Sequence, residues 1–225
     1  GVAAQFGLTP EQTNDRLLAA MEKLRAARAR RPRPLLDDKV IAANNGLMIS
    51  ALARGAAVLG EPEHAVAAVR AAEFVQRELY DAARGVLYRS WREGRGAAEG
   101  FAEDYAYLIQ GLLDLYETTF DVRWLRWAGE LQVAMDARYW DEARGGYFNS
   151  WAEDGSIVLR LKEEYDGAEP APSSVAANNL LRLATLWHDD ALRPPRRWQR
   201  AGSPERHRRR SGAATKIQAQ MVCPW

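Results

Sequence analysis

The chain has 225 residues, enough for one domain of ordinary size or for one domain with a tail. Hydrophobic residues make up 47% and charged residues 27%, which indicates a globular protein and excludes collagen-like repeats. Because Cys223 is the single cysteine, an internal disulfide, a four-cysteine zinc site and a CxxC redox pair are excluded within this chain.

The formal net charge of +1 hides an uneven distribution along the chain. Residues 1–190 hold 22 Lys and Arg against 29 Asp and Glu, whereas residues 191–225 hold 9 against 1. We therefore expect a mildly acidic domain over 1–190 and a basic tail over 191–225, disordered or unrelated to the domain.

No apolar stretch reaches the ~18 residues that a membrane helix needs, so no membrane insertion is expected. The first residues show no basic start followed by an apolar core, so no targeting signal is visible. The sequence favours a cytoplasmic location and leaves secretion open if a further segment precedes Gly1.

The first predicted helix begins at Pro10, where Thr9 and Gln12 have the spacing of a capping box. It ends before Pro32, because proline disfavours helix at the preceding residue. Its apolar residues recur on one face: Leu17, Leu18, Met21 and Leu24.

The following helices alternate in character. The segment from Asp37 to about Leu59 is apolar almost all round, which is typical of a helix buried by its neighbours. After it, amphipathic segments alternate with more apolar ones. We expect helices over about 61–80, 101–119, 121 to beyond Met135, and 173–188.

An internal repeat links these helices. The segment YDAARGVLYRSW (80–91) matches WDEARGGYFNSW (140–151) at an offset of sixty residues. The Asp-x-Ala-Arg-Gly part predicts a turn, and the alternating aromatic residues after it predict a short extended strand.

Apolar helices that alternate with amphipathic ones predict two concentric layers. The sequence therefore predicts an all-α fold, a partial α/α toroid of helical hairpins with short β-turn or hairpin segments between helix pairs. A straight solenoid of helical pairs is the competing interpretation, but its units normally run ~34–47 residues, shorter than the sixty found here.

Four segments resemble successive signatures of the spermatogenesis-associated protein 20 family: RPRPLLDDKVIAANNGLM (31–48), GFAEDYAYLIQGLLDLYE (100–117), GGYF (145–148) and RLKEEYDGAEPAPSSVAANNLLRL (160–183). The resemblance covers about residues 8–188. It implies a helical domain similar to six-hairpin glycosidases and sugar 2-epimerases, with about three of the six or so hairpins within these residues. It also implies a thioredoxin-like domain upstream. Asn44 stands where the family usually has Trp.

Two acidic pairs are the candidate catalytic groups. Asp37-Asp38 and Glu103-Asp104 each fall at the expected start of an inner helix, which would bring them to one rim. Paired carboxylates there can act as general acid and general base. The alternative is that they only complement the positive ends of helix dipoles.

The candidate substrate-binding residues lie around the same rim. The loop over 162–174 carries Asp166 and Glu169, although a solvated acidic loop is the alternative. The asparagines Asn44, Asn45, Asn178 and Asn179 could bind sugar hydroxyls or tie helices together. Aromatic side chains could stack on a sugar ring or pack in the core: Tyr105, Trp91 and Trp151.

The sequence predicts neither a metal nor a cofactor, because it has no closed set of His, Asp and Glu and no phosphate-binding glycine loop. Only His64, His188 and His207 are present, which favours a two-carboxylate sugar hydrolase over a histidine-dependent epimerase. A small carbohydrate is the expected ligand.

The alternative function is a non-catalytic, fertility-related or interaction role. Half a ring would leave an apolar seam exposed, which predicts self-association. The tail, with Trp198 and Arg206, is the only candidate for nucleic-acid or acidic-partner contacts, and an arginine run without a folded scaffold favours disorder over such a site.

Overall fold

A computed structural model describes residues 2–155, 157–163 and 165–193. The chain divides into two units, Gly1–Asp38 and Lys39–Trp225. The basic tail predicted over 191–225 lies outside the described residues from residue 194 onward.

The first unit consists of α1 (Val2–Gln5) and α2 (Pro10–Ala29). The Thr9 hydroxyl accepts a hydrogen bond from the Gln12 N–H at 3.2 Å, and the Gln12 side chain accepts one from the Thr9 N–H at 3.0 Å. This confirms the predicted capping box. Within the first unit, the predicted apolar face is not covered, and no residue of α2 is buried. Capping and internal hydrogen bonds are the contacts that stabilise α2 within this unit.

The second unit holds the remaining helices. Their bounds are α3 (Ala42–Leu59), α4 (Pro62–Glu78), α5 (Ala102–Thr119), α6 (Val122–Tyr139), α7 (Pro172–Leu186) and a short 3-10 helix, η1 (Asp190–Leu192). Among these described helices, none has the length and apolar character needed to cross a membrane.

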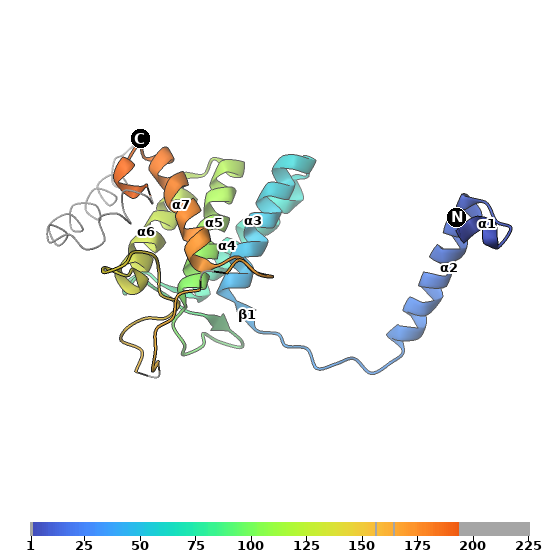
Figure 1. Ribbon diagram of the computed structural model, residues 1–225, viewed down its shortest axis with the longest axis horizontal. Coiled ribbons are helices and arrows are strands. Elements are labelled where there is room, and N and C mark those ends of the chain that lie inside the picture. The colour runs from blue at the N-terminus through green and yellow to red at the C-terminus, as the bar shows by residue number, and fades with distance from the viewer. Residues whose placement is uncertain (1, 156, 164, 194–225) are drawn as a thin grey trace. The chain divides into compact units, whose positions relative to one another are not determined.

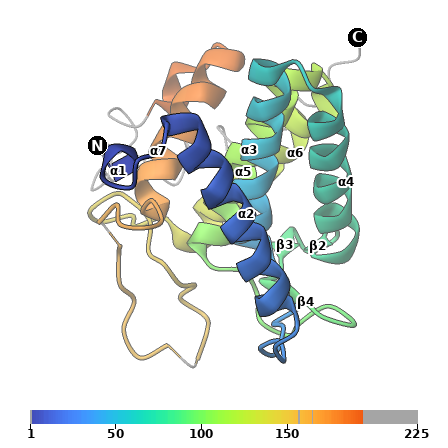
Figure 2. The same ribbon diagram turned by 90° about the vertical axis from the view of Figure 1, so that its right-hand side faces the viewer.

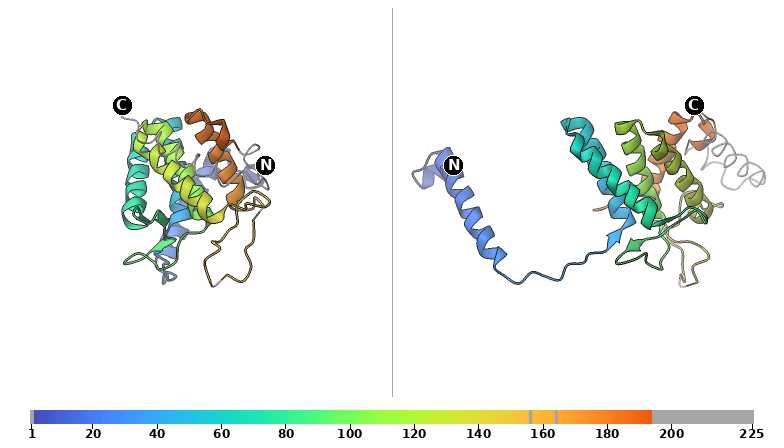
Figure 3. Two further views of the ribbon diagram at one scale, coloured as in Figure 1. Left: turned by 90° about the vertical axis from the view of Figure 1, so that its left-hand side faces the viewer. Right: turned by 180° about the vertical axis from the view of Figure 1, so that it is seen from behind.

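The helices of the second unit form two layers (Figures 1 and 3). One layer contains α3, α5 and α7, and the other contains α4 and α6, so that α5 packs against α3, α6 and α7. The helix α5 is buried over most of its length, whereas the buried residues of α4 are confined to one stripe. This confirms the predicted alternation of inner and outer helices.

Short strands lie at one end of these layers (Figure 2). Antiparallel pairs join β1 (Val40–Ile41) to β4 (Ser90–Trp91) and β2 (Tyr80–Asp81) to β3 (Val86–Leu87). The β2–β3 pair confirms the extended segment predicted after the first turn.

The repeated turns have the same geometry. The Asp81 carboxylate accepts hydrogen bonds from the N–H groups two and three residues on, both at 3.1 Å, and Asp141 does the same at 2.8 and 3.1 Å. The glycine that follows each turn has a positive φ, 63° for Gly85 and 74° for Gly145. One local sequence therefore gives one local structure twice.

Each turn unit also binds the start of an inner helix. The Ala42 N–H, at the start of α3, donates to the Arg89 carbonyl at 2.9 Å. The Ala102 N–H, at the start of α5, donates to the Asn149 carbonyl at 3.0 Å. Both donors and both acceptors are sixty residues apart, so the repeat includes the inner helix as well as the turn.

One predicted helix start is wrong. The helix expected from Asp37 begins at Ala42, because Val40 and Ile41 are extended and pair with Trp91 and Ser90. Asp37 and Asp38 therefore precede β1 instead of lying in the first turn of α3. They are not equivalent to Glu103 and Asp104, which do lie in the first turn of α5.

Candidate functional site

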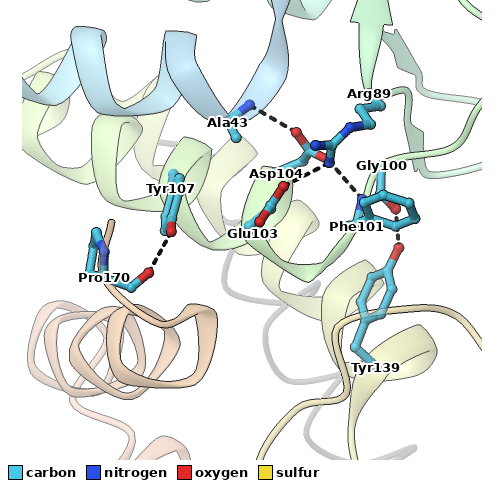
Figure 4. Close-up of polar contacts among 9 residues, drawn as sticks. All are labelled: Ala43, Arg89, Gly100, Phe101, Glu103, Asp104, Tyr107, Tyr139 and Pro170. Atoms are coloured by element: carbon cyan, nitrogen blue, oxygen red, sulfur yellow. Dashed lines mark hydrogen bonds and ion pairs between the residues drawn. The ribbon is translucent and has the colours of Figure 1, made fainter. Parts of the chain in front are cut away.

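The start of α5 is organised around the buried carboxylate of Asp104 (Figure 4). One carboxylate oxygen accepts from the Ala43 N–H of α3 at 2.9 Å. The other accepts from the Phe101 N–H at 2.8 Å and from the Arg89 guanidinium at 3.1 Å. Asp104 thus satisfies backbone donors at the starts of two inner helices and ties these helices together.

Burial raises the pKa of Asp104 to about 6, against the lowering effects of the Phe101 N–H, Arg89 and the Ala43 N–H. Burial also acts on Arg89, but hydrogen bonding to Glu103 and the charge of Asp104 outweigh it and raise the pKa of Arg89. Arg89 therefore stays positively charged beside both carboxylates.

We expect the stability of the second unit to depend on pH through the titration of Asp104. Its pKa is higher in the folded protein than the ordinary value of 3.8 for an aspartate, so the folded protein binds this proton more tightly than the unfolded chain. The resulting contribution to the free energy of unfolding is fully present below pH ~4 and is lost as the pH rises through ~6. The difference in free energy of unfolding between the wild type and Asp104→Asn should fall by about 2 kcal/mol between pH 4 and pH 7. Urea unfolding across this range measures it, and a difference that is constant or grows with pH would contradict the raised pKa.

Glu103 differs from its neighbour in being open to solvent. Its side chain is 26% exposed, and it accepts a hydrogen bond from the Arg89 guanidinium at 2.8 Å. The guanidinium also lies over the Phe101 ring, 4.6 Å from its centroid. Of the pair at the start of α5, Glu103 is the carboxylate that a ligand could reach.

Tyr107 connects this helix start to the acidic loop. It is buried, and its hydroxyl donates to the Pro170 carbonyl (Figure 4). Burial raises the pKa of Tyr107 to about 12, and the negative charges of Glu103, Glu169 and Glu163 contribute to the rise. The carboxylates of the loop and of α5 therefore act on one hydroxyl, so the fold brings the two segments together.

Other parts of the loop are held by structural contacts. The Asp166 carboxylate accepts from the Ala171 N–H at 2.8 Å and from the Ser174 hydroxyl at 3.2 Å, which shapes the entry into α7. Lys162 forms an ion pair with Asp141 of the second turn unit at 2.6 Å. Glu169 is exposed.

The four asparagines differ in their contacts. Asn179 is fully buried, and its amide donates to the Ala106 carbonyl of α5 at 2.8 Å, so it ties α7 to α5. The Asn45 amide donates to the Ile41 carbonyl at 2.8 Å, a contact at the start of its own helix. Asn44 and Asn178 are exposed.

The candidate aromatic residues lie at different depths. Tyr105 is fully buried, and its hydroxyl accepts from the Leu87 N–H at 2.9 Å, which places it in the core instead of at the rim. Trp91 is half-buried with its ring edge-on to Phe74, at 5.5 Å between centroids. Trp151 is half-buried under the guanidinium of Arg138, at 4.4 Å.

Asp37 and Asp38 belong to the first unit, and Glu103 and Asp104 belong to the second. A pairing between these two sets of carboxylates stays a prediction. Within residues 2–155, 157–163 and 165–193, no group of three or more His, Cys, Asp and Glu residues is placed to hold a metal ion.

Arg89 and Tyr107 were not among the site residues predicted from the sequence. Both turn units end in Ser-Trp, but the residue before this dipeptide differs: it is Arg89 in the first unit and Asn149 in the second. That difference was the available signal for Arg89. Tyr107 lies one helical turn after Glu103, so helical spacing placed both on one face.

The fold can be compared with solved structures. A cellobiose 2-epimerase from Bacillus thermoamylovorans aligns with a TM-score of 0.56 at 13% identity, covering 80% of this chain and 43% of that one. A family 105 glycoside hydrolase from C. acetobutylicum aligns with a TM-score of 0.55 at 14% identity, covering 93% of this chain and 59% of that one. These likenesses confirm the predicted α/α toroid architecture.

No family model matches the chain. Human spermatogenesis-associated protein 20 is 46% identical over 190 residues, which is 80% of this chain and 24% of the human protein. The mouse protein of the same name is 44% identical over 190 residues, with the same coverage of both chains. This chain therefore spans about a quarter of the length of the curated relatives it matches. Over the matched residues, the chain is similar to spermatogenesis-associated protein 20, which confirms the family resemblance expected from the sequence.

Proposed function

We propose that this chain is part of a sugar-processing helical ring in which Glu103 is the solvent-facing acid–base group. The observation that carries the proposal is the contrast between the two neighbouring carboxylates, since Asp104 is buried and Glu103 is open to solvent beside Arg89. The likeness to a cellobiose 2-epimerase and to a glycoside hydrolase supports a sugar as the ligand class.

Hydrolysis is the reaction that we favour for this site. Glycoside hydrolysis commonly uses two carboxyl groups, one to donate a proton and one to act as base or nucleophile. The Arg89 guanidinium, at hydrogen-bond distance, holds the Glu103 carboxylate in position, which suits the base or nucleophile. The loop carboxylates Glu163 and Glu169 are the candidates for the second group, because Tyr107, one helical turn after Glu103, donates to Pro170 of the same loop.

An epimerase reaction is less well supported, because the described histidines lie off the inner helices. His64 is on the outer helix α4, 3.2 Å from the Glu61 carboxylate. His188 follows the end of α7 and is exposed. His207 lies outside the described residues.

Glu103→Gln tests the proposal. We expect this chain to bind neutral disaccharides such as cellobiose and the variant to bind them at least tenfold more weakly, because a hydrogen bond to a charged group contributes about 1.5–3 kcal/mol. In full-length human spermatogenesis-associated protein 20, the corresponding change should lower sugar turnover by about 10²- to 10⁴-fold. Isothermal titration calorimetry measures the binding, and reducing-sugar release measures the turnover.

Glu117→Gln is the matched control. Glu117 is also on α5, near its other end, and its side chain is 52% exposed. The control should bind sugar as the wild type does. An equal loss of sugar binding in both variants would show that Glu103 has no specific role in binding. Sugar binding by Glu103→Gln at the wild-type affinity would show the same.

An interaction role is the second candidate. The loop before α7 exposes a group of large apolar side chains: Val158, Leu159, Leu161 and Tyr165. Exposed apolar groups of this kind are typical of contact surfaces between proteins. Failure of both the wild type and the variants to bind any sugar would favour this role over the carbohydrate function.

A further inference from the structure

We propose that Arg89 binds the sugar directly, and that Arg89 and Glu103 together recognise two adjacent hydroxyl groups of a neutral sugar. The proposal rests on the proposed function, in which Glu103 faces the ligand. It adds the side chain that binds beside Glu103 and the feature of the ligand that the pair recognises.

Arg89 uses only part of its hydrogen-bonding capacity within the protein. A guanidinium has five N–H donors, of which Nη1 carries two. Nη1 is 2.8 Å from a Glu103 oxygen and 3.1 Å from an Asp104 oxygen, so each of its hydrogens has an acceptor (Figure 4). Among the described residues, the donors on Nε and Nη2 have no acceptor. Neither nitrogen is a buried atom without a partner, so solvent reaches both.

The guanidinium is nevertheless held in place. The Arg89 N–H donates to the Ala98 carbonyl at 3.0 Å, and the Arg89 carbonyl accepts from the Ala42 N–H at 2.9 Å. The Phe101 ring covers one face of the guanidinium, whose carbon is 4.6 Å from the ring centroid. The buried Asp104 carboxylate holds Nη1. A donor group fixed in this way loses little conformational freedom when a ligand binds to it.

Glu103 supplies an acceptor next to these donors. One of its carboxylate oxygens accepts from Arg89, and the other has no partner among the residues that the structure describes. The Glu103 side chain is 26% exposed and that of Arg89 is 31% exposed. A sugar hydroxyl both donates and accepts, so one hydroxyl can donate to this oxygen while its neighbour accepts from the guanidinium. The charge of Arg89 is already paired with carboxylates, which favours a neutral sugar over an anionic one.

The architecture does not require a charged pair at this place. The second turn unit has Asn149 where the first has Arg89, sixty residues earlier. The starts of α5 and α7 are seventy residues apart, which puts Ser173 at the place of Glu103. The Ser173 hydroxyl lies 3.4 Å from the carbonyl oxygen of Tyr147, in the second turn unit. Neutral groups therefore suffice to join a turn unit to an inner helix, which leaves the charged pair at the first junction available for binding.

The contact with sugar can be measured at Arg89 itself. In protein labelled with ¹³C and ¹⁵N, the Nε–H signal of Arg89 is assigned by NMR through its own side chain. We expect saturating cellobiose to slow the exchange of this proton with water by about fivefold or more. The Nε–H of Arg84 is the control, because Arg84 lies in the same turn unit and pairs with Glu99 at 3.0 Å. Its exchange should not change. An unchanged Arg89 signal in protein that binds cellobiose would overturn the proposal.

Substitutions and deoxy sugars distinguish a direct contact from an effect on the shape of the site. Arg89→Lys should weaken cellobiose binding by about tenfold or more, whereas Arg84→Lys should bind as the wild type does. Cellobiose analogues that each lack one hydroxyl complete a cycle. Two analogues that lack neighbouring hydroxyls should bind the wild type about tenfold more weakly than cellobiose does. One of the two should bind Arg89→Lys about as well as cellobiose does. If every analogue loses the same factor in both proteins, Arg89 acts only on the shape of the site, and the proposal is overturned.

If Arg89→Lys does not fold, the exchange measurement on the wild type decides alone. Cellobiose binding with an unchanged Arg89 signal overturns only this inference. If Arg89 is protected but Glu103→Gln leaves turnover intact, only the proposed acid–base role of Glu103 fails. If the wild type binds no sugar, both are overturned.

Discussion

Replacing Gly46 with alanine is expected to lower the free energy of unfolding of the second unit by about 3 kcal/mol. A Cβ at this position of α3 would lie 2.5 Å from the Leu108 nitrogen and 2.5 Å from the Tyr107 carbonyl carbon of α5. At Gly111 of α5, a Cβ would lie 2.5 Å from the Gly46 carbonyl oxygen. The two helices therefore cross with their backbones in direct contact, and backbone atoms cannot move aside as a flexible side chain can. Urea unfolding followed by circular dichroism measures the loss.

Gly55→Ala is the matched control on the same helix. A Cβ there would have only the His64 ring nitrogen nearby, at 4.0 Å. Because alanine favours a helix interior over glycine by about 1 kcal/mol, this variant should be as stable as the wild type or more so. Equal stability of Gly46→Ala and Gly55→Ala would show that α3 and α5 do not approach as closely as described.

Asp114→Ala is expected to cost about 3 kcal/mol of unfolding free energy. The Asp114 side chain is 2% exposed and forms an ion pair with Arg182 of α7 at 2.7 Å. It also accepts a hydrogen bond from the Ser50 hydroxyl of α3 and lies 3.4 Å from the Arg54 guanidinium. Removing this carboxylate leaves the Arg182 side chain, itself only 17% exposed, without its buried counter-charge. The inner helices would lose the polar group that links all three of them.

Glu117→Gln provides the comparison, because Glu117 pairs with the same guanidinium at 2.9 Å but is 52% exposed. Ion pairs of exposed groups contribute roughly 0–1 kcal/mol, so this variant should remain close to the wild type in urea unfolding. A loss as large as that of Asp114→Ala would mean that charge, and not burial, decides the effect. A loss below ~1 kcal/mol in Asp114→Ala would contradict the described burial.

Much of the architecture could be predicted from local signals. The capping box at Thr9 and the cap at Asp121 both form, and Asp121 accepts from the Arg123 N–H at 3.0 Å. Such caps involve residues two or three apart, so their chemistry is visible in the sequence. The start of α3 was placed too early, because Val40 and Ile41 pair with residues about fifty positions along the chain.

The candidate site was predicted only in part. The pairs Asp37-Asp38 and Glu103-Asp104 were expected at comparable helix starts, but only the second pair lies in the first turn of a helix. Of that pair, Asp104 is buried and Glu103 is partly exposed. Arg89 was missed because its partners lie 14 and 15 residues away, across a turn and a strand. Tyr107 was missed because its contact with Pro170 spans 63 residues.

The amino-acid sequence alone determined the helices of this protein, their alternation and the sixty-residue repeat, because periodicity, caps and turns depend on residues close together in the chain. The packing of α3 against α5 decided which carboxylate at the start of α5 is buried and which one solvent can reach. The position of the Ala43 N–H and of the Arg89 guanidinium around Asp104 makes that carboxylate an internal anchor and leaves Glu103 facing solvent. Whether a carboxylate is buried or exposed depends on what the folded chain places around it, and no local pattern distinguishes two adjacent acidic residues in the first turn of one helix.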